Sequence, residues 1–135
     1  PGQRQGKDIH SPTSSVDLLP TLLAAVGSPI PAWVEGERLP GLGGEENFER
    51  EIYTLEAKSS SAFWKLSQAT FAMRKWQYKV IMYRGYETIG TDLFEVYDLE
   101  SDPEEMNDLV FSQPELVAQL KNELLARFDD INTSH

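Results

Sequence analysis

The chain of 135 residues contains no cysteine. It can therefore form no disulfide, and it has no thiolate to serve as a nucleophile or as a metal ligand. This absence does not assign a compartment, because many exported proteins also lack disulfides. Histidine is nearly absent as well, since His10 and His135 lie near opposite ends. The sequence thus offers no histidine pair for metal binding or for acid–base catalysis.

Long hydrophobic runs are also absent. The longest runs from Leu22 to Val26, far short of the roughly 20 apolar residues of a membrane-spanning helix. Residues 1–7 have no apolar centre, so they do not resemble a signal peptide. The chain starts at Pro1 in a polar, loop-like stretch without an initiator methionine. We therefore expect it to be a piece of a longer protein.

Positive charge is scarce, with 12 basic residues against 22 acidic ones and a formal net charge of −10. A field of this sign repels a phosphate backbone. Arg74, Lys75 and Lys79 are interleaved with Trp76 and Tyr78, a mixture that could suggest nucleic-acid binding. In a strand, however, such cations lie on an edge or on a solvent-facing side. We expect no nucleic-acid partner.

The composition that remains, 40% hydrophobic and 25% charged, is typical of a folded domain. Residues 15–26 predict a helix, because Ser14 or Ser15 can cap its amino end and Asp17 lies favourably in its first turn. Gly27 suits the position after its last turn. The helix carries an apolar stripe and is therefore expected to pack against another surface. The stripe consists of Leu18, Leu19, Leu22, Leu23 and Val26.

Residues 28–50 are rich in proline and glycine and show little periodicity, which predicts a long irregular connection that wraps a surface. From residue 51 onward the pattern changes to short strands joined by loops that are too short for parallel crossovers. The expected strands are residues 52–57, 69–74, 78–83 and 93–99. The side chains expected to be buried in the sheet are Phe71, Met73, Tyr78, Val80 and Met82.

A carboxy-terminal helix is the clearest element. Ser112, Pro114 and Glu115 have the form of a capping box, with Ser112 as the N-cap. One face of this helix is apolar and is formed by Leu116, Val117, Leu120, Leu124, Leu125 and Phe128. The sequence therefore predicts an α+β fold. A small antiparallel sheet of three to four strands packs against the carboxy-terminal helix, and an amino-terminal helix and a long irregular loop precede it.

Three stretches, in this order, resemble the carboxy-terminal part of the sulfatase family. Residues 15–23, running on to Gly27, match the family's V-D-L-x-P-T-L-L…G helix. Residues 35–39 are similar to its G-x-S-L segment. Residues 95–109 match its E-L-Y-D-L-x-x-D-P-x-E-x-x-N-L segment.

Residues 73–79 also look like the R-x-x-x-x-K-Y hairpin of that family, so the resemblance spans almost the whole chain. Two positions depart from the pattern. Arg38 stands where the family usually has serine, and Asp108 stands where it usually has asparagine. Neither position is catalytic in the family pattern, so the departures concern the subfamily more than the family.

The resemblance implies an alkaline-phosphatase-like parent with a large α/β catalytic domain followed by a smaller carboxy-terminal unit. Sulfatases hydrolyse sulfate esters with a formylglycine made from a Cys/Ser-x-Pro-x-Arg motif, assisted by a calcium ion and by lysine and histidine. The resemblance places all of these groups upstream, so no catalytic, cofactor-binding or metal site is expected in this chain. Residues 1–50 would then end the catalytic domain, and residues 51–135 would form the carboxy-terminal subdomain. The implied partner is the upstream catalytic domain, and a sulfate ester would be met only through the parent.

Two patterns in the chain superficially suggest a site. Ser112 and Pro114 have the spacing of the formylglycine motif, but Leu116 replaces its arginine and helix capping explains the match. Asp98 and Asp102 begin like a calcium-binding EF-hand loop, but proline follows where that loop needs glycine. We expect a solvated turn there, held by local side chain–backbone hydrogen bonds.

Aromatic residues leave a further possibility. Trp33 and Trp76 are expected in a core or in a contact between domains, whereas Phe63 and Trp64 could reach toward a substrate pocket in the parent. The leading interpretation is an inactive, structural and pocket-closing subdomain of a sulfatase. The alternatives are a free-standing binding module of the same fold and the tail of a related phosphoesterase.

Overall fold

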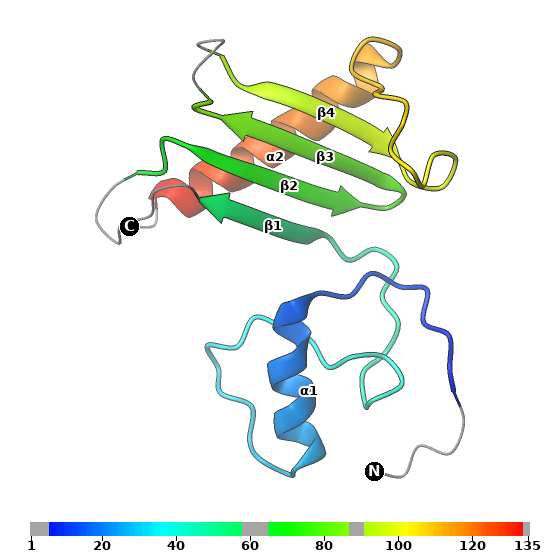
Figure 1. The fold of residues 1–135 in the computed structure, drawn as a ribbon. Coiled ribbons are helices and arrows are strands. Elements are labelled where there is room, and N and C mark those ends of the chain that lie inside the picture. The colour runs from blue at the N-terminus through cyan, green and yellow to red at the C-terminus, as the bar shows by residue number, and fades with distance from the viewer. Residues whose placement is uncertain (1–5, 58–64, 87–90, 134–135) are drawn as a thin grey trace. The chain divides into compact units, whose positions relative to one another are not determined.

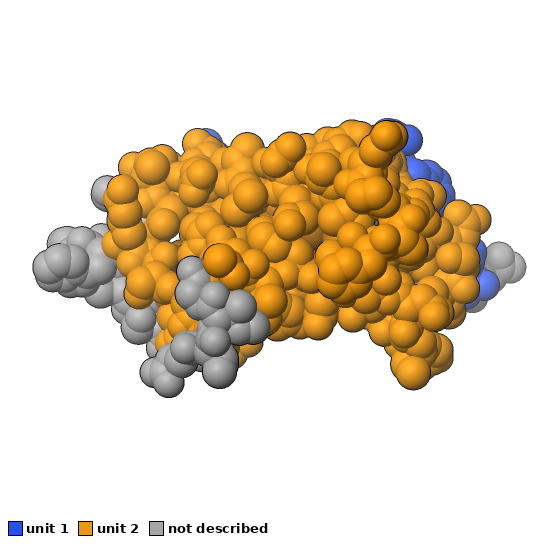
Figure 2. Space-filling view, turned by 90° about the horizontal axis from the view of Figure 1, so that it is seen from above, with its two compact units in different colours: residues 1–52 blue, residues 53–135 orange. Residues whose placement is uncertain are grey.

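The computed structural model describes residues 6–57, 65–86 and 91–133. The chain divides into two compact units, residues 1–52 and residues 53–135 (Figure 2). Each unit is described by itself. In the described part of the chain, no helix combines the length and the hydrophobicity that crossing a membrane requires.

The second unit is built on a four-stranded sheet with the strand order β1-β2-β3-β4 (Figure 1). Adjacent strands in space are adjacent in sequence, so the sheet is a meander. Met73 pairs with Val80 across β2 and β3, and Val80 pairs with Val96 across β3 and β4, both antiparallel. The strands are β1 (Ile52–Ala57), β2 (Ala69–Lys75), β3 (Tyr78–Arg84) and β4 (Leu93–Asp98). The expected antiparallel sheet of three to four strands is confirmed.

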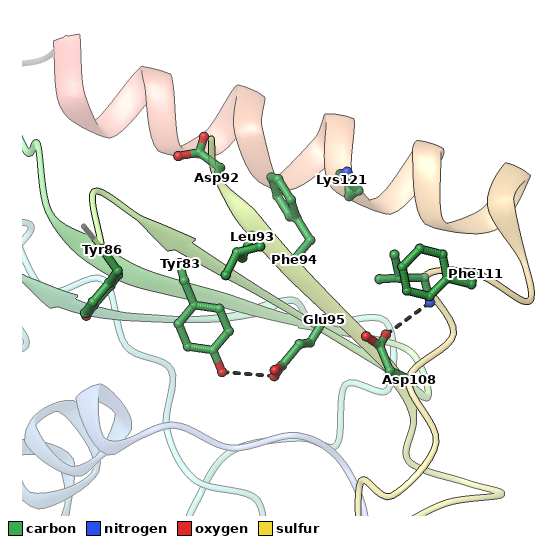
Figure 3. A pocket seen from close by; sticks show the side chains of 10 residues that line it. Tyr83, Tyr86, Asp92, Leu93, Phe94, Glu95, Asp108, Phe111 and Lys121 are labelled. Atoms are coloured by element: carbon green, nitrogen blue, oxygen red, sulfur yellow. Dashed lines mark hydrogen bonds between the residues drawn. The ribbon is translucent and has the colours of Figure 1, made fainter. Parts of the chain in front are cut away.

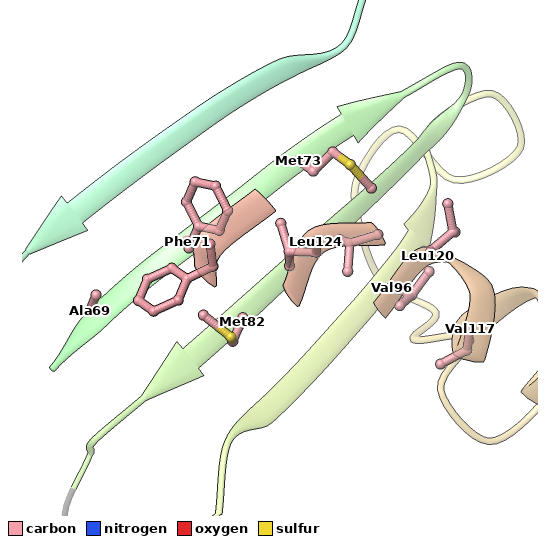
Figure 4. Close-up of a cluster of buried hydrophobic side chains, with 10 residues drawn as sticks. Ala69, Phe71, Met73, Met82, Val96, Val117, Leu120 and Leu124 are labelled. Atoms are coloured by element: carbon pink, nitrogen blue, oxygen red, sulfur yellow. The ribbon is translucent and has the colours of Figure 1, made fainter. Parts of the chain in front are cut away.

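Helix α2 (Pro114–Thr133) covers one face of this sheet (Figure 1). Its apolar residues recur at helical spacing and meet every second residue of the strands, because side chains alternate between the two faces of a sheet. Figure 4 shows this cluster between strands and helix. The core consists of Ala69, Phe71, Met73, Val80, Met82, Val96, Val117, Leu120, Leu124 and Phe128. Tyr78, expected in the core, is only partly buried against it.

Aromatic rings join the sheet to the helix. The ring of Phe71 stacks on Tyr53 at 5.8 Å between centroids and meets Phe128 of α2 at 5.5 Å. The guanidinium of Arg84 lies 4.5 Å from the centre of the Phe128 ring. Each such pair adds roughly 0.5–1.5 kcal/mol to the stabilisation from buried area.

The turn between β2 and β3 places Trp76 outside the core. Its φ angle is 53°, in the left-handed region, and its side chain is 42% exposed. Two-residue hairpins favour positive φ because this matches the twist of the strands, and they usually place asparagine or glycine there. Trp76 therefore does not lie in the core, because the geometry of the turn directs it outward, and its expected role in a contact between domains stays a prediction.

In the first unit, helix α1 (Leu18–Ala25) follows a 3-10 turn at Ser15–Asp17. Pro20 costs no hydrogen bond, since the first N–H groups of a helix have no partner within it. Gly27 ends the helix with φ of 71°. Its N–H donates to the Ala24 carbonyl at 3.1 Å, and the N–H of Ser28 donates to Leu23 at 2.9 Å. This is the glycine-dependent helix end that the sequence predicted.

Helix α2 begins differently from the expectation. It starts at Pro114, and the hydroxyl of Ser112 donates to the Leu109 carbonyl at 3.4 Å. Ser112 therefore serves the turn before the helix. Its predicted N-cap role is wrong, because the preceding loop closes on Leu109, whose carbonyl also accepts the N–H of Gln113 at 3.0 Å.

Replacing Leu124 with alanine tests the core assignment, because this side chain is fully buried between α2 and the sheet. We expect the free energy of unfolding to fall by about 2–5 kcal/mol, the usual cost of a buried leucine-to-alanine change. Urea denaturation followed by circular dichroism measures it. Leu22→Ala is the matched control, since Leu22 is 62% exposed and should change stability by less than about 0.5 kcal/mol. Equal effects of the two substitutions would contradict the assignment.

Candidate functional site

Asp17 is the most deeply buried charged residue of the first unit, with a side chain that is 1% exposed. The guanidinium of Arg50 binds it through two parallel contacts, Nη2 to Oδ1 at 2.6 Å and Nη1 to Oδ2 at 2.7 Å. The backbone N–H groups of Ser14 and Glu37 donate to the same carboxylate at 2.7 and 3.0 Å. Such a fork of charge-assisted hydrogen bonds is geometrically specific. It ties the helix start to the middle of the irregular segment, at Glu37, and to its end, at Arg50.

Thr21 makes a second tie one turn later. Its hydroxyl donates to the Asp17 carbonyl at 2.7 Å and accepts the N–H of Leu39 at 2.8 Å. Gly36 passes so close to the helix that a Cβ atom there would overlap the Val16 carbonyl. The two stretches that resemble sulfatase segments, residues 15–23 and 35–39, are therefore in direct contact.

The contacts of Asp17 set its protonation state. Burial alone would raise the pKa of this carboxyl, but the hydrogen bonds from Arg50, Ser14 and Glu37 outweigh burial and hold the pKa below its ordinary value of 3.8. The pairing likewise raises the pKa of Arg50. Both groups are therefore charged at neutral pH, as expected for a buried pair that is fully hydrogen-bonded.

The first unit carries its large apolar side chains on the outside. Among its described residues the buried ones are Ser11, Pro12, Asp17, Pro20 and Thr21, which include no large aliphatic or aromatic side chain. The stripe predicted on α1 is solvent-exposed at Leu18 (53%) and Leu22 (62%). The other exposed apolar residues are Val16, Leu19, Val26, Ile30, Trp33, Leu42 and Phe48. Large apolar side chains exposed in this number are typical of a surface that another part of a protein covers.

Trp33 belongs to this exposed set, with 72% of its surface accessible. It does not lie in a core of the described chain, so its expected role in a contact between domains stays a prediction. Phe63 and Trp64, which the sequence suggested near a substrate pocket, lie outside the described residues.

The acidic run after β4 is a self-capped turn. The carboxylate of Asp98 accepts the N–H of Glu100 at 3.0 Å, and that of Asp102 accepts the N–H groups of Met106 and Asn107 at 3.1 and 2.8 Å. These bonds confirm the expected local side chain–backbone pattern. Within the described ranges, no group of three His, Cys, Asp or Glu side chains is arranged to hold a metal ion.

The basic residues around the hairpin have acidic partners. Lys75 Nζ lies 2.7 Å from Glu123 of α2, and Lys79 Nζ lies 2.7 Å from Glu105. These pairings give two of the three basic residues acidic neighbours, and the expectation that the chain has no nucleic-acid partner stays a prediction.

The residues that superficially suggested catalysis do not assemble a site. Ser112 is bonded to Leu109, and Leu116, which replaces the arginine of the formylglycine pattern, packs against the core. His10 is exposed in the first unit. The side chains of the described residues therefore do not fit a formylglycine or a calcium ion.

An open hollow of about 600 Å³ lies beside strand β4 in the second unit (Figure 3). Phe94 lies on the α2 side of the sheet with the ammonium of Lys121 4.1 Å from its ring centre, while Tyr83 and Glu95 lie on the other side. Phe111 and Asp108, from the loop before α2, form the remaining wall.

Tyr83 in this hollow donates to Glu95 at 2.9 Å. Burial, with the help of this hydrogen bond, raises the pKa of Tyr83 to about 12. The phenol therefore stays protonated at neutral pH and acts as a hydrogen-bond donor, not as a base or a nucleophile. Tyr83 is consequently suited to binding and is not an activated nucleophile.

Comparisons with known proteins identify the family of the chain. Residues 1–133 match the family model described as "N-sulphoglucosamine sulphohydrolase, C-terminal". The chain belongs to this sulfatase family. It is 30% identical over 132 residues to human arylsulfatase K, and the match covers 92% of this chain and 23% of the human protein. This chain therefore spans about a quarter of the length of the curated relatives that it matches.

Solved sulfatase structures share the fold. The structure of BT1596, a 2-O GAG sulfatase, has 30% sequence identity and a TM-score of 0.58, covering 87% of this chain and 24% of that one. The structure of BT4656 with its substrate D-glucosamine-2-N,6-O-disulfate has 25% identity and a TM-score of 0.56, covering 85% of this chain and 23% of that one. The predicted resemblance to the carboxy-terminal part of sulfatases is confirmed.

The structure gives the family stretches a physical role that sequence reasoning had missed. Asp17 was expected to act in the first turn of its helix, but its main partner is Arg50. The signal available in the sequence was a carboxylate in an apolar helix, since a buried charge needs a counter-charge. Arg38 and Arg50 both qualified, so the sequence alone did not select the partner.

Substituting Asp17 with asparagine tests the role of this ion pair. The change keeps the shape of the side chain but leaves Arg50 with only the more distant Glu37, 3.9 Å from its Nε, as a counter-charge. Removing the close partner of a buried pair costs up to roughly 3–5 kcal/mol. We expect cleavage within residues 28–50 to become at least about tenfold faster in limited proteolysis read by mass spectrometry, because cleavage follows the opened population. Glu46→Gln is the control, since Glu46 pairs with Lys7 at 3.0 Å on the surface, and it should change the rate less than about twofold.

The depressed pKa of Asp17 gives this prediction a pH dependence. A carboxyl with a lower pKa in the folded state contributes stability above its ordinary value of 3.8 and loses it as the pH falls through the folded-state pKa. The unmodified chain should thus approach the pepsin sensitivity of Asp17→Asn only below about pH 3.8. Equal sensitivity of the two proteins at neutral pH, to a protease that is active there, would contradict the proposed role of the pair.

Proposed function

We propose that this chain is the carboxy-terminal part of a sulfuric ester hydrolase, that it is inactive by itself, and that it serves the parent as a structural, pocket-closing subdomain. The family match over residues 1–133 supports the parent's activity. The structural role is supported by the first unit, in which Asp17 and Arg50 are buried while the large apolar side chains are exposed.

The apolar exterior of the first unit is explained if it docks on the upstream catalytic domain. Leu18, Leu22 and Val26 lie on α1 with exposed fractions of 53%, 62% and 75%. Covering one large aliphatic side chain stabilises a protein by about 1.5–3 kcal/mol. The match covers 23% of human arylsulfatase K, so about three quarters of that relative lies outside it, which is ample for such a domain. Residues 1–50 then complete the catalytic domain, and residues 51–135 form the subdomain beside it.

The chemistry of the parent belongs to residues outside this chain. Hydrolysis of a sulfate ester needs a nucleophile and a cation that offsets the charge developing on the sulfate oxygens. A formylglycine and a calcium ion supply these in sulfatases. Because the side chains described here fit neither group, we assign both to the upstream domain and route no step of the reaction through this chain.

The substrate class follows from the named relatives only as a proposal. One solved relative is a 2-O GAG sulfatase and another binds a sulfated glucosamine. We therefore propose that the substrate of the parent is either a sulfated sugar or a simple arylsulfate. The family match favours this interpretation over a free-standing binding module or a phosphoesterase tail.

An assay of sulfate release tests the proposal directly. Residues 1–135 and the parent protein are each incubated with calcium and either 4-nitrophenyl sulfate or glucosamine 6-sulfate. We expect turnover by the parent and none above buffer by the chain alone. Ser112→Ala in the parent is the matched control and should leave kcat/KM unchanged, because Ser112 only serves the turn before α2.

Each of the other outcomes points to a different conclusion. Turnover by residues 1–135 alone would overturn the assignment of the chemistry to the upstream domain. A parent that hydrolyses 4-nitrophenyl phosphate but no sulfate ester would establish the phosphoesterase alternative. A natural start codon directly before Pro1 would favour the free-standing module.

A further inference from the structure

The outer edge of β4 is occupied by the chain's own loop at one end and is open at the other. The N–H of Leu109 donates to the Val96 carbonyl at 2.8 Å, and the N–H of Val96 donates to the Asp108 carboxylate at 3.0 Å. At the following position along the strand, the Asp98 carbonyl accepts the N–H of Asp102 at 2.8 Å. The N–H and carbonyl of Val96 and the carbonyl of Asp98 therefore point away from β3 and are satisfied.

Phe94 has the same orientation, because backbone groups two residues apart point to the same side of a strand. It lies opposite Met82 in the register, so its N–H and carbonyl face the open edge. Within the described ranges no protein group binds them. The loop leaves the edge after Leu109, just before it would reach this position. An unpaired strand edge is a template for a further strand.

The hollow of about 600 Å³ lies at this free position. Phe94 and Lys121 border it on the α2 side of the sheet, and Leu93 and Glu95 border it on the other (Figure 3). A strand added at Phe94 would project successive side chains to these two sides in turn. The hollow is therefore placed where an added strand needs pockets for its side chains.

The walls of the hollow indicate which side chains fit. Phe111 is 93% exposed and Leu93 is 44% exposed, and both gain by being covered with an apolar group. Glu95 and Asp108 accept hydrogen bonds from neutral donors, the Tyr83 hydroxyl and the N–H groups of Val96 and Val110. Their negative charges favour a lysine or arginine beside the apolar residue.

We propose that a short extended segment of the parent polypeptide, outside residues 1–135, adds to β4 at Phe94 as a fifth strand. An apolar side chain of this segment fills the space between Phe94 and Phe111, and a basic side chain reaches Glu95 and Asp108. The proposal rests on the proposed function for the existence of the parent. A second copy of this chain is disfavoured, because two chains with a net charge of −10 repel each other.

Photo-crosslinking in the parent protein tests the proposal. Phe111 is replaced by p-benzoylphenylalanine, and cross-links are mapped by mass spectrometry in a mixture of isotopically light and heavy protein. A cross-link within one polypeptide joins two peptides of the same isotopic label. We expect such links, light–light and heavy–heavy, from position 111 to one segment outside residues 1–135. Met106 is the matched control, since it is 78% exposed on the same loop but does not border the hollow, and it should not reach that segment.

Hydrogen exchange supplies an independent readout. The amide of Phe94 should exchange at least about tenfold more slowly in the parent than in residues 1–135, because the added strand takes up its N–H. An equal exchange rate, no cross-link from position 111, or mixed light–heavy links would overturn the proposal. Sulfate release by the same parent sample separates the proposed function from the proposed fifth strand. If the parent releases sulfate but the amide of Phe94 is unprotected, only the fifth strand is refuted.

Discussion

The ion pair between Asp17 and Arg50 is the interaction on which the arrangement of the first unit depends. Two charges with exposed fractions of 1% and 13% are stable there only because every contact is made. The same carboxylate receives the N–H groups of Ser14 and Glu37. One side chain thus holds the start of the helix, the middle of the irregular segment and its end. This polar centre occupies the place that an apolar core has in most domains.

The two units therefore differ in what they need from the rest of a protein. The second unit buries Phe71, Leu120 and Phe128 between its own sheet and helix, which is the organisation of an independent domain. The first unit is polar inside and apolar outside. Under the proposed function it docks on a larger body, and the match to human arylsulfatase K, of which this chain covers 23%, leaves room for such a body. Residues 6–52 would then gain the rest of their stability when that body covers their exposed apolar side chains.

Local periodicity made the second unit predictable. The alternation in β2 and β3 and the apolar face of α2 depend on neighbours in the sequence, and the structure confirms them. Interactions that depended on distant or irregular segments escaped prediction. Asp17 and Arg50 are 33 positions apart, Trp76 is turned outward by its hairpin, and Ser112 serves a turn instead of capping the helix. Asp108 accepts the N–H of its neighbour Val110, and it also satisfies the N–H of Val96 at the edge of β4, a contact that the local sequence did not indicate.

Residue-level hydrogen exchange of residues 1–135 at neutral pH is the most direct measurement of this contrast. Amides in β2, β3 and α2 should be protected by a factor of about 10³ or more, because opening them requires global unfolding. Amides of α1 should be protected at least about tenfold less than those of β2, β3 and α2, because the apolar face of this helix is uncovered. Equal protection of α1 and α2 would contradict the account, since the first unit would then be stable without the surface that its apolar side chains require.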